Sequence, residues 1–155
     1  MTRRPAEVIT FQPQFRDFFR LLNLEWIEKY FCIEHKDLEQ VNNPEECISS
    51  GGQIFFVLIE GEVVGTCALY HVGPRKFELA KMAVRPDCRG QGLGDLLIEK
   101  AEEWARAQDA AEIMMLSNTV LTPAIQLYKK HGYQVLHLGQ NPDYQRCNIE
   151  LSKQL

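Results

Sequence analysis

The sequence has no long apolar run and no surplus of positive charge. Its 17 Lys and Arg residues are outnumbered by 21 Asp and Glu residues, for a formal net charge of -4. No strong positive field would therefore attract it to nucleic acid or to an anionic membrane. No apolar stretch approaches the roughly 18 residues that a membrane-spanning helix needs, and the basic segment 1–5 is not followed by the apolar region of a signal peptide. We expect a soluble, cytoplasmic protein with neither nucleic acid nor membrane as a partner.

Paired cysteines and metal-ligand spacings are also absent. The five cysteines are scattered and odd in number, with no CxxC pair and no Cys/His spacing that suits zinc. This distribution favours free thiols in a reducing compartment and predicts that the protein holds no metal.

The apolar pattern predicts alternating strands and helices. The chain shows no repeat, linker or low-complexity tract, so we expect a single domain over residues 1–155. The order of elements predicts an α/β fold, with one mixed sheet and helices on both faces. The expected strands are 7–11, 54–59, 63–70, 77–84, 113–116, 133–138 and 146–151, and the expected helices are 13–30, 35–41, 43–47, a segment from about 92, and 123–131.

Local signals refine several of these elements. The run 54–59 is continuously apolar, which is typical of a strand buried on both faces. Thr122 is expected as the N-cap of the last helix, and Gly132 as its left-handed C-terminal residue. In the first long helix, large apolar residues recur every three or four positions and are expected on one buried face. They are Phe15, Phe18, Phe19, Leu22, Trp26 and Tyr30.

A glycine-rich turn, residues 89–94 (Arg-Gly-Gln-Gly-Leu-Gly), lies between the strand that ends at Val84 and the next helix. The start of a helix has unpaired backbone N–H groups and a partial positive charge, which suit a phosphate or pyrophosphate. Glycines allow the backbone to approach such an anion without an intervening Cβ. Arg89 adds a cation with several hydrogen-bond donors. The turn therefore predicts an anion-binding site.

Other phosphate-binding motifs fit this turn poorly. The Walker A pattern is absent. A dinucleotide site needs Gly-x-Gly-x-x-Gly, whereas the spacing here is Gly-x-Gly-x-Gly, followed by Asp95, which would repel a pyrophosphate. The next strand ends in Leu116-Ser117-Asn118, without the acidic residue that binds a ribose. A purely structural turn that caps a helix stays open as an alternative.

Arg89-x-x-Gly92-x-Gly94 resembles the signature of the GNAT superfamily of N-acetyltransferases. The segment 81–86 is similar to that family's fourth strand, and Asn118 with 123–133 resembles its second signature region. The resemblance covers almost the whole chain. It implies the GNAT fold: a single mixed, mostly antiparallel, twisted sheet of about seven strands, which is splayed between strands 4 and 5.

The resemblance implies acetyl-CoA as the co-substrate. In the family, backbone N–H groups of the turn hold the CoA pyrophosphate, and the free edge of the fourth strand pairs with the pantetheine amides. The turn residues implied are Arg89, Gly90, Gln91, Gly92, Leu93 and Gly94. The strand residues implied are Met82, Ala83 and Val84, with Asn118 across the gap.

The implied reaction is direct attack of a neutral primary amine on the thioester in a ternary complex. It requires loss of an amine proton, stabilisation of an oxyanion, and a hydrogen bond to the departing thiolate. Backbone N–H groups near Met82–Val84 would serve the oxyanion. Tyr128 matches the tyrosine that in many relatives donates to the sulfur; the alternative is a packed core residue.

The base is less clearly indicated. Glu78 matches a position where some family members carry a catalytic glutamate; the alternative is a solvated strand charge. Without a bulge it would share a strand face with Ala80 and Met82, and it would act through water. His71 is a weaker candidate, and many relatives use no dedicated base. The other histidines, at positions 35, 131 and 137, are expected at the surface.

In this family the acceptor binds between the first helices and the last strands. The positions singled out here are Phe31, Glu34, His35, Tyr144, Arg146 and Cys147. The acceptor is expected to be a small-molecule or peptide amine, and nothing in the sequence specifies it. A homodimer is compatible with the family. Two other interpretations stay open: a non-catalytic acyl-CoA-binding sensor module, and an acyltransferase for longer acyl groups or a hydroxyl acceptor.

Overall fold

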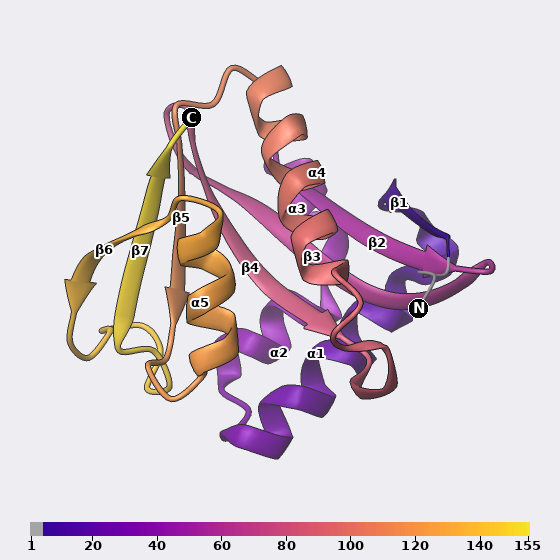
Figure 1. Ribbon diagram of the computed structural model, residues 1–155, viewed down its shortest axis with the longest axis horizontal. Coiled ribbons are helices and arrows are strands. Elements are labelled where there is room, and N and C mark those ends of the chain that lie inside the picture. The colour runs from indigo at the N-terminus through magenta and orange to yellow at the C-terminus, as the bar shows by residue number, and fades with distance from the viewer. Residues whose placement is uncertain (1–4) are drawn as a thin grey trace.

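Within residues 5–155, which the computed structural model describes, seven strands form one mixed sheet (Figure 1). The order across the sheet is β1-β2-β3-β4-β5-β7-β6. Neighbouring strands are antiparallel except for β4 and β5, which are parallel. The expected mixed, mostly antiparallel sheet is confirmed. The strands are β1 (Ala6–Thr10), β2 (Gln53–Ile59), β3 (Glu62–Gly73), β4 (Lys76–Val84), β5 (Glu112–Ser117), β6 (Gln134–Leu138) and β7 (Ile149–Gln154).

Helices cover both faces of the sheet, as expected. Figure 1 shows α4 and α5 on the near face, and α1, α2 and α3 behind the sheet. Most of the basic N-terminal segment lies outside the described residues. The helices are α1 (Arg16–Tyr30), α2 (His35–Asn42), α3 (Pro44–Ser49), α4 (Leu93–Ala107) and α5 (Thr122–Lys130), with short 3-10 turns at Pro13–Phe15 and Pro86–Cys88.

Strand β2 shows why the sheet needs both helical layers. Phe55, Val57 and Ile59 pack into the core beneath α4, while Ile54, Phe56 and Leu58 pack into the core beneath α1 and α3. Successive side chains of a strand point to opposite faces, so a continuous apolar run fills two cores at once. The prediction of a strand buried on both faces is confirmed.

The two central parallel strands separate after a short contact. β4 pairs with β5 only from Lys76 to Glu78, although β4 continues to Val84 and β5 to Ser117. The expected splay is confirmed. β4 also carries a bulge, because Ala80 pairs with Ala68 and Ala83 with Thr66, so two residues of β4 lie opposite one of β3. The first of these two is Lys81, whose φ of 54° is in the left-handed region.

Some local predictions are wrong in detail. Thr122 is the first residue of α5 rather than its N-cap, because the first helical hydrogen bond runs from the Ile125 N–H to the Leu121 carbonyl, which makes Leu121 the N-cap. β7 begins at Ile149 rather than Arg146, since residues 139–148 form a loop. By contrast, Gly132 ends α5 with a φ of 93°, as predicted.

The aromatic stripe of α1 is only partly buried. Phe18 is 40% exposed and Tyr30 is 48% exposed, whereas Phe19 and Ile27 are fully buried. The face that contacts the sheet is rotated towards Asn23 and Ile27, which leaves Phe18 at the margin. One consequence is that aromatic residues at the end of α1 are available to line a cleft.

Gly52 permits the close approach of α3 and β3. A Cβ at this position would lie 2.1 Å from the Leu69 carbonyl oxygen and 2.9 Å from the Cys47 carbonyl oxygen. We expect Gly52→Ala to lower the free energy of unfolding by about 3 kcal/mol, through overpacking against backbone. Urea denaturation measures the change.

Gly61→Ala is the matched control. Gly61 has a φ of 79°, but a Cβ there would meet nothing within 4 Å, so only the left-handed backbone is penalised, by about 1 kcal/mol. Equal losses in the two variants would show that the contact at Gly52 does not constrain the fold.

Candidate active site

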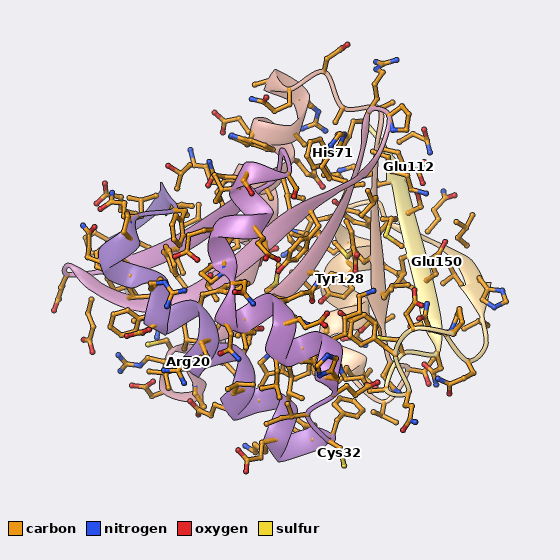
Figure 2. The ribbon with its side chains drawn as sticks, turned by 180° about the vertical axis from the view of Figure 1, so that it is seen from behind. Arg20, Cys32, His71, Glu112, Tyr128 and Glu150 are labelled. Atoms are coloured by element: carbon orange, nitrogen blue, oxygen red, sulfur yellow. The ribbon has the colours of Figure 1, made fainter. Side chains whose placement is uncertain are left out.

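A cleft of about 770 Å³ lies where β4 and β5 separate. The cleft is bordered by the second half of β4, the glycine turn, the start of α4, the end of β5, α5, the end of α1 and the loop before β7. Figure 2 shows Tyr128 near the middle of the molecule, in the opening between β4 and β5. Residues from distant parts of the sequence therefore meet in one site.

The glycine turn forms one end of the cleft. Gly90 and Gly92 have φ values of 78° and 77°, a conformation that costs other residues roughly 1–2 kcal/mol. Gly92 caps α4, and its carbonyl accepts the N–H of Leu96. The N–H groups at the start of α4 precede the first intrahelical donor and have no helical acceptor. The turn therefore presents unpaired donors and a partial positive charge to the cleft.

Most of the predicted turn residues border this cleft. Arg89, Gly90, Gly92, Leu93 and Gly94 line it, but Gln91 lines a separate depression of about 240 Å³. Gly94 has a structural role as well. A Cβ there would lie 2.8 Å from Leu127 Cδ2, so this glycine allows α4 and α5 to pack closely.

Asp95 is neutralised by its neighbours. Its carboxylate accepts hydrogen bonds from Lys130 Nζ at 2.8 Å and lies 2.7 Å from His131 Nε2. Lys130 and His131 lower the pKa of Asp95. His131 was expected at the surface, but its side chain is only 12% exposed, because α5 packs it against α4. His35 and His137 are exposed, as expected.

The predicted strand residues lie along an unpaired edge. Met82, Ala83 and Val84 line the cleft, beyond the point where β4 leaves β5. Their backbone groups on that side have no ladder partner. Asn118 lies across the gap, and both polar atoms of its side chain bond to the backbone of the protein itself. Nδ2 donates to the Arg146 carbonyl at 2.7 Å, and Oδ1 accepts the Val120 N–H at 2.9 Å. This amide holds the loop before β7 in place.

Tyr128 is a neutral hydrogen-bond donor in the cleft. It lines the wall together with Ala124, one helical turn earlier. Burial raises the pKa of the Tyr128 hydroxyl to about 12, so it stays protonated at neutral pH. The hydroxyl has no hydrogen-bond partner in the part of the chain that is described, whereas the Tyr133 hydroxyl donates to Glu102 at 2.9 Å. A cleft-lining donor of this kind is free to bind a ligand.

Glu78 lies in the cleft, on the opposite face of β4 from Met82. The bulge at Lys81 shifts the alternation, so Met82 packs against the α4 core while Glu78 is on the opposite side of β4 from Leu79, a member of that core. The shared face expected for a strand without a bulge is therefore not formed. Glu78 is half-buried, and burial raises the pKa of its carboxyl. These properties differ from those of a solvated charge on a strand, which was the alternative interpretation of Glu78.

His71 does not line the cleft. Its ring lies against Phe77, with 5.2 Å between ring centroids. Figure 2 shows His71 close to Glu112 at the far end of the sheet from the glycine turn. A direct role for His71 in the cleft is not supported by this position.

A buried ionic cluster closes the other end of the cleft. Asp37 of α2 has a fully buried side chain; it accepts a hydrogen bond from Lys81 Nζ at 2.6 Å and further ones from both Nη atoms of Arg146. Burial alone would raise the Asp37 pKa, but the bonds from Arg146 and the charge of Lys81 lower it. Glu34 also accepts from Arg146, at 3.3 Å. The cluster joins α2, the β4 bulge and the loop before β7.

Of the six positions predicted to contact the acceptor, four line the cleft and two do not. Phe31, Tyr144, Arg146 and Cys147 line the cleft. Glu34 is not among the residues that line it, and His35 pairs with Glu39 at the surface. Sequence reasoning missed Asp37 and Lys81. Lys81, a lysine within an otherwise mostly apolar strand, was the available signal of a buried ion pair. Its partner Asp37 could not be found from the sequence, because it lies 44 positions away.

The Tyr144 ring is held by cations and by a hydrogen bond. Lys36 Nζ, Lys81 Nζ and Arg146 Cζ lie 5.0, 5.2 and 4.7 Å from its centroid. Its hydroxyl donates to Gln40 Oε1 at 2.9 Å. This end of the cleft is therefore built from side chains that several contacts hold in place, unlike the backbone-lined turn.

Asp37→Asn should strongly destabilise the protein. The change leaves buried Lys81 and Arg146 without their shared carboxylate, and we expect a loss of about 3 to 5 kcal/mol in the free energy of unfolding. Because folding lowers the Asp37 pKa, the carboxylate contributes stability above roughly pH 4 and loses it as the pH falls through its folded-state pKa. The difference between variant and wild type should therefore shrink below that pH in urea titrations.

Glu45→Gln is the control for this prediction. Glu45 pairs with Arg16 at 2.7 Å, but both side chains are largely exposed. Solvent screens such a pair, so little stability should be lost. A loss in Asp37→Asn no larger than in Glu45→Gln would contradict a structural role for the buried cluster.

The chain is similar to known acetyltransferases in sequence and in structure. The acetyltransferase (GNAT) family model matches residues 17–133. An uncharacterised N-acetyltransferase of Schizosaccharomyces pombe is 26% identical over 150 residues, which cover 91% of each chain. A GNAT-family acetyltransferase from Staphylococcus aureus superposes with a TM-score of 0.87 at 19% identity, over 97% of this chain and 99% of the other.

A phosphinothricin acetyltransferase from Sinorhizobium meliloti, in complex with acetyl-CoA, superposes with a TM-score of 0.81 at 15% identity, over 97% and 88% of the two chains. At these identities the structural likenesses show the fold. Two further findings concern residues 5–155: no helix among them is long and apolar enough to cross a bilayer, and they contain no group of three or more His, Cys, Asp or Glu side chains arranged to hold a metal ion.

Proposed function

The chain belongs to the acetyltransferase (GNAT) family and is an acyl-CoA-dependent acetyltransferase, and on this premise we propose that it transfers the acetyl group of acetyl-CoA to a primary amine by direct attack in a ternary complex. One observation carries the proposal. β4 leaves β5 beside a left-handed glycine turn, and both open into the cleft that contains Tyr128.

The cleft fits acetyl-CoA in three places. Left-handed Gly90 and Gly92 and the unpaired donors of α4 suit a pyrophosphate, and Arg89 adds a cation beside them. The free edge of β4 at Met82–Val84 offers backbone partners to an extended chain that carries amides. The volume of about 770 Å³ lies within the range of ligand pockets. Gln91 is the one turn residue that we place outside this site.

Side chains away from the glycine turn would accept and donate the protons of the reaction. Acetyl-CoA supplies an electrophilic thioester carbonyl. Glu78 accepts a proton from the incoming amine, since a half-buried carboxyl of raised pKa is a better base than a solvated one. Tyr128 donates a hydrogen bond to the departing sulfur, and N–H groups of the β4 edge stabilise the oxyanion. The acceptor enters past Phe31, Tyr144, Arg146 and Cys147, and its amine belongs to a small molecule or a peptide.

Gly92→Glu should abolish binding of acetyl-CoA. The substitution places a side chain and a negative charge at the proposed pyrophosphate site, and we expect at least a roughly 100-fold rise in Kd, equivalent to about 2.7 kcal/mol. Calorimetric titration with acetyl-CoA, CoA, NAD and ATP measures affinity and cofactor choice together. Gly92→Asn is the control, because asparagine tolerates the left-handed backbone and adds no charge.

Retention of wild-type affinity in Gly92→Glu would place the phosphates elsewhere. Absence of binding by both acetyl-CoA and CoA to a folded wild-type sample would leave the turn a structural feature. A series of acyl-CoAs of increasing chain length, run in the same way, separates an acetyltransferase from one that uses longer acyl groups.

Tyr128→Phe should slow the reaction without weakening cofactor binding. Loss of the donor to the leaving sulfur is expected to lower kcat by about 10- to 100-fold, measured by thiol release with an amine panel. Tyr133→Phe is the matched control, because Tyr133 is buried outside the cleft and donates to Glu102. Equal turnover in wild type and Tyr128→Phe, with intact CoA binding, would remove Tyr128 from the mechanism. A protein that binds CoA but acetylates no amine would instead fit a sensor module.

A further inference from the structure

Tyr70 carries a buried polar atom for which the fold provides no partner. Among residues 5–155, its hydroxyl is the one side-chain nitrogen or oxygen that is shielded from solvent and has no hydrogen bond; the unpaired Tyr128 hydroxyl belongs to a residue that lines the cleft. Leaving such a group unsatisfied costs about 1–3 kcal/mol. Buried hydroxyls without a protein partner usually bind an ordered water or a ligand group. The position of Tyr70 indicates which group this is.

Tyr70 lies directly opposite Glu78. The two residues are cross-strand partners in the ladder between β3 and β4, so their side chains leave the same face of the sheet with Cβ atoms about 5 Å apart. The Tyr70 ring packs into the core beneath α1 and α3, and Glu78 lines the cleft. Glu78 thus provides an acceptor in the cleft, and Tyr70 provides a donor next to it, although Tyr70 itself does not line the cleft.

Neither group satisfies the other directly. No hydrogen bond joins the Tyr70 hydroxyl to Glu78, and the Glu78 carboxyl forms no hydrogen bond or ion pair within the described part of the chain. The two groups are nevertheless close enough for the charge of Glu78 to affect Tyr70. A tyrosine hydroxyl reaches further from its Cβ than a glutamate carboxyl does, so a single water molecule can bridge the remaining distance.

We propose that Tyr70 is a positioning residue for acetyl transfer: its hydroxyl donates, through one water molecule, to the ionised Glu78 carboxylate and so sets the pH range in which Glu78 accepts the proton of the amine. The inference rests on the proposed function of Glu78. In the step concerned, the N–C bond forms, the C–S bond breaks and one amine proton moves to Glu78. The thiolate, which accepts a hydrogen bond from Tyr128, takes up a proton from solvent, and Glu78 later releases its proton to solvent. Tyr70 keeps its own proton throughout.

The electrostatic surroundings support these roles. Burial raises the pKa of Tyr70 far above its usual value, and Cys47, Tyr144 and Glu78 raise it further. Tyr70 therefore keeps its proton and is a hydrogen-bond donor at neutral pH. A donor to the ionised carboxylate opposes the effect of burial on Glu78, because a hydrogen bond to the charged form favours that form.

Other charges also face Glu78 and must be held constant in any test. Lys81 of β4 and Lys36 of α2 lower its pKa, whereas Asp143 of the loop and Glu150 of β7 raise it. The other titratable or charged groups at this corner are Glu34, Asp37, Cys47, Tyr144, Arg146 and Cys147. Tyr70→Phe leaves all of these in place and removes a single oxygen atom.

Titration of Glu78 tests the inference without a known acceptor. Protein labelled with ¹³C in the glutamate carboxyl groups is titrated by NMR with CoA bound, and the Glu78 signal is identified by its loss in Glu78→Gln. In Tyr70→Phe the Glu78 midpoint should rise by about one pH unit, the size expected for a lost hydrogen bond to a charged group. Tyr133→Phe should leave the midpoint unchanged, although it removes a hydroxyl that donates to Glu102.

Activity measurements then separate this inference from the proposed function. With an amine acceptor, the acid limb of kcat/KM should move to higher pH in Tyr70→Phe by the same amount. Wild-type turnover in Glu78→Gln would overturn the base assignment itself. If Glu78→Gln is impaired but Tyr70→Phe has an unchanged Glu78 midpoint, only the role of Tyr70 is wrong. A fall in kcat at every pH with an unmoved limb would likewise make Tyr70 a structural residue.

Discussion

The buried carboxylate of Asp37 is the interaction on which the shape of the cleft depends. It binds Lys81 and Arg146 and accepts the backbone N–H of Glu34, and so joins a helix, the β4 bulge and the loop before β7. Lys81 has an unfavourable left-handed backbone, which its buried ion pair compensates. Removing one member leaves an uncompensated buried charge, which strongly destabilises a folded protein. Through the bulge it also determines which β4 side chains face each side of the sheet.

One end of the cleft is lined mainly by backbone groups and the other mainly by side chains. The end at the glycine turn consists mainly of backbone: unpaired N–H groups at the start of α4, left-handed glycines, and the free edge of β4. Such a surface suits a ligand with a phosphate and repeated amides. The other end consists of side chains from α1, β4 and the 139–148 loop. Its shape depends on side chains rather than on backbone, which is why our proposal places the acceptor there.

Burial adjusts the acids and donors of the cleft in the same direction. It raises the pKa of Glu78, of Tyr128 and of Cys147, the last to about 11. The tyrosine therefore remains a donor at neutral pH and the thiol remains protonated, while the carboxyl becomes a stronger base. Our proposals for Glu78, Tyr128 and Tyr70 use this common effect. They assign acceptance of the proton to the carboxyl and donation of hydrogen bonds to the hydroxyls.

The sequence by itself determined the features that depend on neighbouring residues. These are the strands and helices, the run 54–59 that fills two cores, and the glycine turn at the start of a helix. The family resemblance added the splay between β4 and β5. Only the tertiary structure decided which residues meet: Asp37 with Arg146, Asp95 with His131, and Glu78 on the face opposite Met82. The reason is physical. A local pattern reflects backbone geometry within a few residues, whereas a bulge or a buried ion pair depends on packing between segments as distant as positions 37 and 146.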